Sequence, residues 1–211
     1  MADYAPLGAT AGVVRDPSNH DHIFYFAANK SEGGTGTNGQ GKIYCVSALT
    51  GTDCSGFTST AVLDFTTNSK GWSDIFSSDV AMPDRFFVLH NRKMSCILYA
   101  NGAPCWINKS TNNNLAIIPV YNPSVTGLAQ ICAGRNGSAA SVCFNPNTGA
   151  VSAPASAVFS IFDNAATGYT ISSFVIPNTT KILYAYRDPS EKNPFCFDYS
   201  TDSLCTNYNP Q

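Results

Sequence analysis

Two histidines near the N-terminus stand among side chains that could bind a metal ion. His20 and His22 are flanked by Asp16, Asn19 and Asp21, and imidazole and carboxylate groups are common ligands of divalent metals. A spacing of two residues places both rings on one side only where the chain is extended, and the sequence identifies no third ligand. We therefore interpret this stretch as a solvated turn and predict no metal ion or other cofactor.

Eight cysteines could supply either metal-binding thiolates or disulfides. They form spaced pairs without a CxxC motif, which favours an oxidised framework, typical of secreted proteins, over a zinc site. The residues after Met1 lack the basic start and apolar core of a signal peptide. We therefore interpret the chain as a mature secreted protein with an added methionine. The cysteines are Cys45, Cys54, Cys96, Cys105, Cys132, Cys143, Cys196 and Cys205.

Motifs of the common enzyme classes are missing from the sequence. It contains no GxSxG, HExxH, Walker or EF-hand pattern, and cysteines held in disulfides leave no thiol nucleophile. The glycine-rich residues 33–41 precede no predicted helix, so they indicate a hairpin loop rather than a phosphate site. No pair among the fourteen acidic residues marks glycosidase chemistry. The sequence therefore predicts no catalytic residue.

The cysteine spacing reveals a repeat that would position these groups. Cys45 and Cys54 are nine residues apart, and the same spacing separates Cys96 from Cys105 and Cys196 from Cys205. An odd separation lets two side chains face each other across a β-hairpin whose loop has an even number of residues. A residue that tolerates a left-handed backbone ends each predicted turn. These residues are Gly51, Gly102, Gly149 and Asp202, six positions after Cys45, Cys96, Cys143 and Cys196.

The third hairpin departs from this spacing. It starts at Cys143, but the position nine residues later holds Ser152. Cys132 lies eleven residues before Cys143, which is again an odd separation, and it belongs to the preceding predicted strand. We therefore predict a Cys132–Cys143 disulfide that joins the second and third strands of this copy, instead of the third and fourth.

Two apolar segments joined by a proline turn precede each hairpin. Proline presets a turn and has no N–H to give to a β-ladder, so each copy supplies four antiparallel strands. The segments are residues 12–14 and 22–26, 80–82 and 86–89, 117–121 and 128–131, and 174–176 and 182–186, with Pro17, Pro83, Pro123 and Pro177 between them. The copies cover about 8–65, 72–110, 112–155 and 157–211 of a single domain, 1–211.

Four such units can bury their faces by stacking radially, which predicts an all-β fold of disulfide-stapled repeats forming a small β-propeller; a β-sandwich is the alternative. In length and copy number the chain resembles the four-bladed propellers of the hemopexin type over its whole length. The Asp-Ala-Ala blade starts of that family are missing, so the resemblance implies neither its ligands nor its metal site. The Cys and Thr-Gly hairpins are similar to those of kelch-type repeats, in which four blades would form part of a larger ring.

Composition argues against two classes of partner. The 211 residues carry a net charge of -2, so nothing attracts the whole molecule to nucleic acid. The longest apolar runs, residues 115–120 and 157–162, are much shorter than the roughly eighteen residues of a membrane span. We therefore expect a soluble protein without a membrane span, whose charge-driven binding is local.

Charge is predicted to separate between the two ends of the blades. Nine of the twelve cations fall in the connections between second and third strands or between copies, and the acids predicted at that end are Glu32, Asp64, Asp74, Asp163, Asp188 and Glu191. The opposite end would hold Arg15, Arg85 and Lys181 against Asp16, Asp21, Asp53, Asp84, Asp198 and Asp202. Three second-to-third connections contain an arginine, namely Arg92, Arg135 and Arg187, and guanidinium groups donate paired hydrogen bonds to sulfate, carboxylate and phosphate.

Aromatic and amide side chains are predicted at the same cationic end. Trp72, Trp106, Tyr169 and Asn113 could stack on sugar rings and hydrogen-bond to them. The sequence thus favours a secreted, non-catalytic binding module, lectin-like or adhesive, that engages an acidic glycan or an acidic surface of an extracellular protein. One alternative is a structural subunit that associates with further copies of itself. Another is a carbohydrate-active enzyme of propeller fold.

Overall fold

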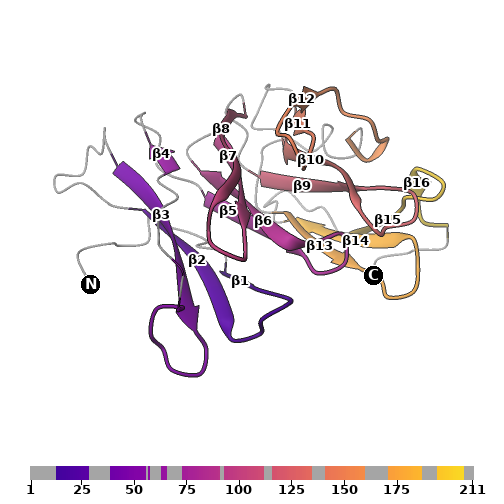
Figure 1. Ribbon diagram of the computed structural model, residues 1–211. Helices are drawn as coiled ribbons and strands as arrows, with labels where there is room; N and C mark the ends of the chain where they lie inside the picture. Colours follow the sequence, from indigo (N-terminus) through magenta and orange to yellow (C-terminus); the bar gives the residue numbers. More distant parts are fainter. Residues whose placement is uncertain are drawn as a thin grey trace. The chain divides into compact units, whose positions relative to one another are not determined.

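The computed structural model describes residues 13–28, 39–55, 57, 63–65, 73–90, 93–111, 116–134, 141–159, 171–186 and 194–206. In these ranges sixteen strands form four antiparallel sheets of four strands each, and every sheet follows chain order (Figure 1). We call the sheets blades 1 to 4. The chain divides into two compact units, Met1–Ser110 with blades 1 and 2 and Thr111–Gln211 with blades 3 and 4. The predicted repeat limits and single domain stay predictions.

The strands of the first unit lie in two consecutive meanders. Blade 1 consists of β1 (Val13–Arg15), β2 (His22–Ala28), β3 (Gly39–Ser47) and β4 (Leu63–Phe65), and blade 2 of β5 (Ser73–Ser78), β6 (Met82–His90), β7 (Lys93–Leu98) and β8 (Pro104–Ser110). The first strands of the two blades, β1 and β5, contact each other, as do the last strands, β4 and β8. This is the side-by-side stacking of neighbouring propeller blades.

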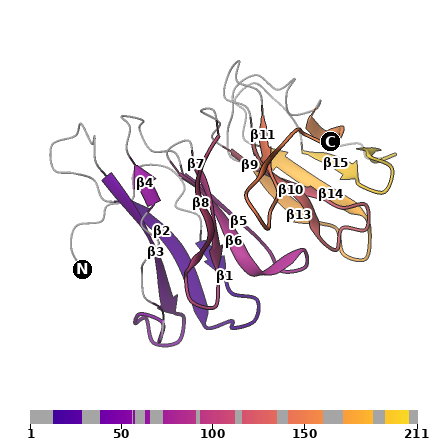
Figure 2. The same cartoon turned by 45° about the horizontal axis from the view of Figure 1, so that its top comes forward.

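The second unit repeats the arrangement. Blade 3 consists of β9 (Ala116–Tyr121), β10 (Leu128–Gly134), β11 (Val142–Phe144) and β12 (Val151–Ser152), and blade 4 of β13 (Ile171–Val175), β14 (Lys181–Tyr186), β15 (Phe195–Asp198) and β16 (Ser203–Leu204). Its first strands, β9 and β13, also contact each other. The predicted all-β, propeller-like fold of four stapled, four-stranded repeats is therefore confirmed, and each meander can be followed in Figure 2.

The turns between third and fourth strands have the predicted backbone. Gly51, Gly102, Gly149 and Asp202 have φ angles of 69°, 71°, 65° and 48°. At the three glycines the N–H donates to the carbonyl four residues earlier, over 2.8 to 3.0 Å. A residue without a β-carbon adopts this left-handed conformation at little cost, so the glycines allow the strand to reverse within four residues.

All four predicted disulfides are present. Cys45–Cys54, Cys96–Cys105 and Cys196–Cys205 each join the third strand to the segment that follows its turn, which is β8 in blade 2, and Cys132–Cys143 joins β10 to β11. Cys132 and Cys143 lie directly opposite each other in the sheet, while Ser152 faces Cys143 from the other side. Cys132 thus occupies the second-strand position that Phe24, Phe87 and Leu183 hold in the other blades.

The first strand of blade 2 lies earlier than predicted. We expected residues 80–82 to form it because they are apolar, but β5 spans Ser73–Ser78 and residues 79–81 form the turn. Pro83 therefore belongs to β6 rather than to the turn. The sequence of β5 is mostly polar, and its strand conformation comes from pairing with β6, with a register shift at its end between Ser77 and Ser78.

Within each unit a definite face of one blade packs on the opposite face of the next. In each blade, the front is the face that carries the second-strand residue opposite the leading cysteine; these residues are Phe24, Phe87, Cys132 and Leu183. The back is the opposite face, which carries the neighbours of these residues along the second strand. The back residues are Ile23 and Tyr25 in blade 1, Phe86 and Val88 in blade 2, Ile131 and Ala133 in blade 3, and Ile182 and Tyr184 in blade 4. In the first unit, front residues of blade 1 and back residues of blade 2 form one buried cluster, which includes Val14, Phe24, Ile43, Phe86, Val88 and Ile97. The Phe24 and Phe86 rings lie 5.3 Å apart.

The second unit makes the equivalent contact through two tyrosines. Tyr184 lies on the back of blade 4, and its hydroxyl donates to the Pro119 carbonyl on β9 over 2.8 Å. The Tyr199 hydroxyl lies 2.5 Å from that of Tyr184, and the Tyr199 ring packs against Tyr121. Burial raises the pKa of Tyr184 well above its ordinary value, because the ionised form would lose its water. The blades of this unit are thus joined by a buried polar network.

Tyr99 is the equivalent of Tyr199 in the first unit, three residues after the leading cysteine, but its surroundings differ. Val88 replaces the partner tyrosine, because Val88 pairs with Ser95 as Tyr184 pairs with Phe195. The Tyr99 hydroxyl is buried, with Ser77 nearby but without a partner in hydrogen-bond geometry. Burial, reinforced by the charges of Asp79 and Asp16, raises the pKa of Tyr99.

This contrast predicts that replacing tyrosine by phenylalanine changes the free energy of unfolding differently at Tyr184 and at Tyr99. Tyr184→Phe should lower the free energy of unfolding by about 1 to 3 kcal/mol, because it removes a buried donor from a carbonyl. Tyr99→Phe should leave it unchanged or raise it by up to about 1 kcal/mol, because it removes a buried hydroxyl that lacks a partner. Urea unfolding of both variants measures the difference. A larger loss for Tyr99→Phe would contradict the prediction.

Among the described residues, no helix is long and apolar enough to cross a membrane.

Candidate functional site

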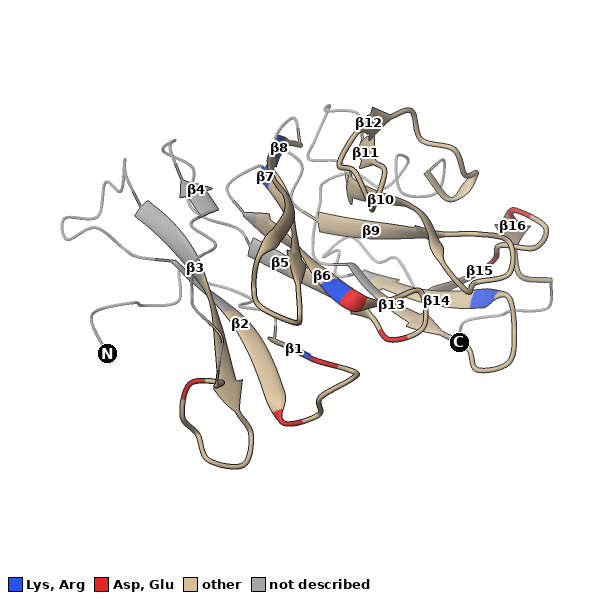
Figure 3. Ribbon diagram, in the orientation of Figure 1, with Lys and Arg blue, Asp and Glu red and all other residues tan. Residues whose placement is uncertain are grey.

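The connections at the two ends of each blade carry different charges. We call the end that holds the turns between first and second and between third and fourth strands the turn end, and the opposite end the loop end. In the first unit the turn end holds five acidic residues and two arginines, and in the second unit it holds one lysine and two acids (Figure 3). These residues are Asp16, Asp21, Asp53, Asp79, Asp84, Arg15 and Arg85 in the first unit and Asp198, Asp202 and Lys181 in the second.

Several of these carboxylates stabilise the turns themselves. Asp21 accepts hydrogen bonds from the Leu49 N–H over 2.8 Å and from the Ser47 hydroxyl over 3.0 Å, which lower its pKa. Asp198 accepts from the Ser200 and Thr180 hydroxyls, each over 2.7 Å, with the same effect on its pKa. Each carboxylate thus connects the turn before the second strand of its blade to the turn after the third strand through hydrogen bonds. Their role is therefore structural.

The carboxylates of Asp84 and Asp202 also have partners. Asp84 pairs with Arg85 at 2.7 Å, and hydrogen bonding to this guanidinium lowers the pKa of Asp84. Asp202 accepts from the Ser156 hydroxyl and the Ala157 N–H within the second unit. Asp79 was not predicted at this end, because the residues of its turn were expected to form a strand. Its position gives the turn end of the first unit one more negative charge than the sequence analysis predicted.

The histidine-rich stretch is organised as a turn. Oδ1 of Asp16 accepts from both the N–H and the hydroxyl of Ser18, and the Asn19 side chain accepts from the Asp21 N–H. These bonds hold the turn between β1 and β2. His22 packs the edge of its ring towards Phe24. The stretch is thus a hydrogen-bonded turn in which Asp16 is buried.

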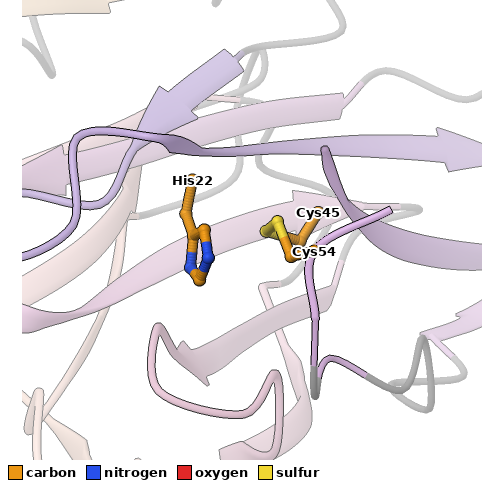
Figure 4. A group of neighbouring side chains, drawn as sticks. All are labelled: His22, Cys45 and Cys54. Carbon is orange, nitrogen blue, oxygen red and sulfur yellow. A yellow bond between two sulfur atoms is a disulfide. The ribbon is translucent and has the colours of Figure 1, made fainter. Parts of the chain in front are cut away.

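One group of three potential metal ligands exists among the described residues. His22 lies close to the sulfur atoms of Cys45 and Cys54 (Figure 4). The two sulfurs are bonded to each other, and a metal ion binds the thiolate form of cysteine. The group therefore belongs to the disulfide framework and does not constitute a metal centre.

Two lysines lie at the loop end of blade 2, where β5 also carries Asp74. Lys93 begins β7 and pairs with Ser110, and Lys109 pairs with the next residue of β7, Met94. Both lysines thus lie at the end of the sheet remote from its turns (Figure 3). They are half-buried, so their stems pack on the sheet. Arg92 precedes Lys93 directly in the chain.

Most of the predicted ligand-binding residues lie outside the described residues. These are Arg92, Arg135, Arg187, Trp72, Tyr169 and Asn113. The ends of the adjoining strands are described, however. Gly134 ends β10 and Tyr186 ends β14, one residue before Arg135 and Arg187. Each of the three arginines therefore follows the second strand of its blade within two residues.

Trp106 belongs to the core of its sheet. Its side chain is only 7% exposed, and its ring lies 5.9 Å from that of Phe87. A bulge causes this: Ile97 pairs with Pro104 but Cys96 pairs with Trp106, so that β8 gains one residue at Cys105. A shift of one residue turns a side chain to the opposite face of a strand. Trp106 is therefore not available to stack on a ligand at the loop end.

Comparison with known proteins adds one structural similarity. No protein-family model matches the chain, and no curated protein matches it. Among solved structures, the chain is similar to BamB from Moraxella catarrhalis, with 12% sequence identity and a TM-score of 0.38. The similarity covers 93% of this chain and 66% of that one, so the chain spans slightly less than two thirds of its length.

Proposed function

We propose that the protein is an extracellular, non-catalytic binding module that engages acidic groups through the loop end of its blades. The observation that carries the proposal is the recurrence of arginine directly after the second strand, at Arg92, Arg135 and Arg187. Four disulfides fit an oxidising environment. The ligand class is an acidic glycan or an acidic protein surface.

The geometry of the second unit supports this reading. The rings of Tyr121, at the turn end of blade 3, and Tyr199, at the turn end of blade 4, lie 5.7 Å apart, so both blades have their turn ends on the same side. Because strands alternate in direction along a meander, β10 and β14 both end on the opposite side. Arg135 and Arg187 follow these two strand ends.

The first unit adds two lysines next to the connection that contains Arg92. Lys93 and Lys109 both lie at the loop end of blade 2, on opposite faces of the sheet, because Lys109 pairs with Met94 and not with Lys93. Guanidinium groups bind sulfate and carboxylate oxygens in pairs, while ammonium groups add attraction that depends on ionic strength. A ligand with repeated acidic groups fits such a surface better than a single anion.

Binding to heparin and to polygalacturonate, as sulfated and uronic probes, tests the proposal. The variant R92Q/R135Q/R187Q should bind at least about a hundredfold more weakly, because each charged hydrogen bond contributes about 1.5 to 3 kcal/mol. The variant R15Q/R85Q/K181Q makes the same change of net charge at the turn end and should keep its affinity. Unchanged binding by the first variant, or equal loss by both, would refute the loop-end site.

A further inference from the structure

Asp16 is a buried carboxylate at the turn end of blade 1, and it is only 3% exposed. Its Oδ1 accepts both hydrogen bonds from Ser18, while no group in the described part of the chain donates to its Oδ2. The two arginines of this end bond elsewhere, since Arg85 pairs with Asp84 and Arg15 donates to a backbone carbonyl. Burial of a carboxylate is costly unless a positive group or further donors compensate it.

The same turn in blade 3 is built with a neutral side chain. The Asn122 N–H donates over 2.8 Å to the second-strand carbonyl that closes the turn, as the Asp16 N–H does over 3.0 Å. Oδ1 of Asn122 accepts from the Ser124 hydroxyl, two residues later, as Oδ1 of Asp16 accepts from Ser18. An amide is therefore sufficient for this turn, and the turn does not require the negative charge of Asp16.

The buried hydroxyl of Tyr99 lies on the face of blade 2 that packs against Asp16. Asp16 is on the front of blade 1, two residues after Val14, and Tyr99 is on the back of blade 2, two residues after Ile97. These two faces pack on each other. Tyr99 is 3% exposed, and its hydroxyl has no partner in hydrogen-bond geometry among the described residues.

Asp79 adds a second carboxylate at the same place. It directly follows β5, as Asp16 directly follows β1, and these two strands contact each other. Besides burial, the charges of Asp79 and Asp16 raise the pKa of Tyr99, so both carboxylates lie close enough to act on its hydroxyl. Asp79 itself is exposed. Three oxygen-bearing side chains thus gather between the first turns of blades 1 and 2, next to solvent.

We propose that Asp16, Asp79 and Tyr99 bind a calcium ion between the first turns of blades 1 and 2. Ca²⁺ takes oxygen ligands from carboxylates and neutral groups and completes its coordination with water. The ion would compensate the buried charge of Asp16, and the hydroxyl oxygen of Tyr99 would gain a partner. This inference is independent of the proposed acidic ligand, which binds at the loop end.

The second unit lacks each element of this site. Asn122 follows β9 and Ile176 follows β13, so neutral residues stand where the first unit has its two aspartates. The hydroxyl of Tyr199, the equivalent of Tyr99, already has the Tyr184 hydroxyl as its partner at 2.5 Å. The proposal therefore assigns the ion to the first unit alone.

Calorimetric titration of the chelator-treated protein with CaCl₂ tests the inference. The wild type should bind one ion with a dissociation constant of about 10⁻⁴ to 10⁻³ M, the range of extracellular calcium modules. Asp16→Asn should bind at least about tenfold more weakly, because it keeps the acceptor for Ser18 but loses the charge. Asp79→Asn, at an exposed position, should show the same loss without affecting the core. Asp53→Asn removes the same charge from another exposed turn of this end and should keep the wild-type affinity.

Terbium luminescence tests whether Tyr99 lies at the ion. Tb³⁺ replaces Ca²⁺ at oxygen sites and emits when a tyrosine beside it is excited. The wild type should show this emission, Tyr99→Phe should lose most of it, and Tyr199→Phe, the matched control in the second unit, should keep it. Three outcomes would overturn the proposal: no calcium binding by the wild type in the millimolar range, equal affinities of Asp79→Asn and Asp53→Asn, or full emission from Tyr99→Phe. Far-ultraviolet circular dichroism shows whether each variant is folded.

Discussion

Cys132→Ala is expected to lower the free energy of unfolding by about 3 kcal/mol or more. In the chain-entropy model a disulfide that closes a loop of this length contributes about 3 kcal/mol. Cys132 and Cys143 are both 0% exposed, so the substitution also removes a buried sulfur and leaves a cavity. Urea unfolding under non-reducing conditions gives the magnitude.

A second substitution should recover most of this loss by moving the disulfide. Ser152 lies directly opposite Cys143 on β12, at the spacing of nine residues that the other three disulfides use. Cys132→Ala combined with Ser152→Cys should therefore form a Cys143–152 bond and regain about 2 kcal/mol or more. Mass mapping identifies the bond, and Cys132→Ala with Ser152→Ala is the control. If Cys132→Ala with Ser152→Cys were no more stable than this control, a disulfide at the third-to-fourth-strand position could not replace the Cys132–Cys143 disulfide in blade 3.

Gly102→Ala is expected to cost about 2 to 4 kcal/mol, through strain at φ 71° and a steric clash. A β-carbon at this position would lie 2.2 Å from the ring of Phe57. That ring packs against Phe24 at 5.2 Å, so relief of the clash requires the ring to leave the buried cluster of the first unit. Thermal or urea unfolding measures the loss.

Gly51→Ala separates the two contributions. Gly51 has nearly the same φ, 69°, but a β-carbon there would meet no atom within 4 Å. Its substitution should cost only the backbone strain, about 1 kcal/mol. Equal losses at the two glycines would show that Phe57 does not restrain Gly102.

The parts of the fold that follow from backbone chemistry could be predicted from the sequence. A left-handed turn needs glycine or a tolerant residue such as aspartate, so Gly102 and Asp202 marked their turns correctly. Cysteines separated by an odd number of residues correctly predicted disulfides across hairpins. Strand β5 could not be found in the same way, because the polar sequence Ser73–Ser78 becomes a strand only through pairing with β6.

The candidate site was less accessible to sequence reasoning. Trp106 was predicted at a sugar-binding surface, but one extra residue in β8 turns it into the core, and no local sequence signal marks that bulge. The acidic turn end was largely predictable because aspartate favours turns. Val14 is buried and Phe174, at the equivalent position of blade 4, is 63% exposed, a difference that two apolar residue types in the sequence do not mark.

The short range of the four disulfides has a consequence for how the protein acquires them. Each bond joins cysteines nine or eleven residues apart, so the two thiols of a pair meet as soon as one hairpin has formed. Closing so small a loop costs less entropy and takes less time than bringing distant cysteines together. Pairing within one copy is therefore favoured over pairing with a cysteine of another copy.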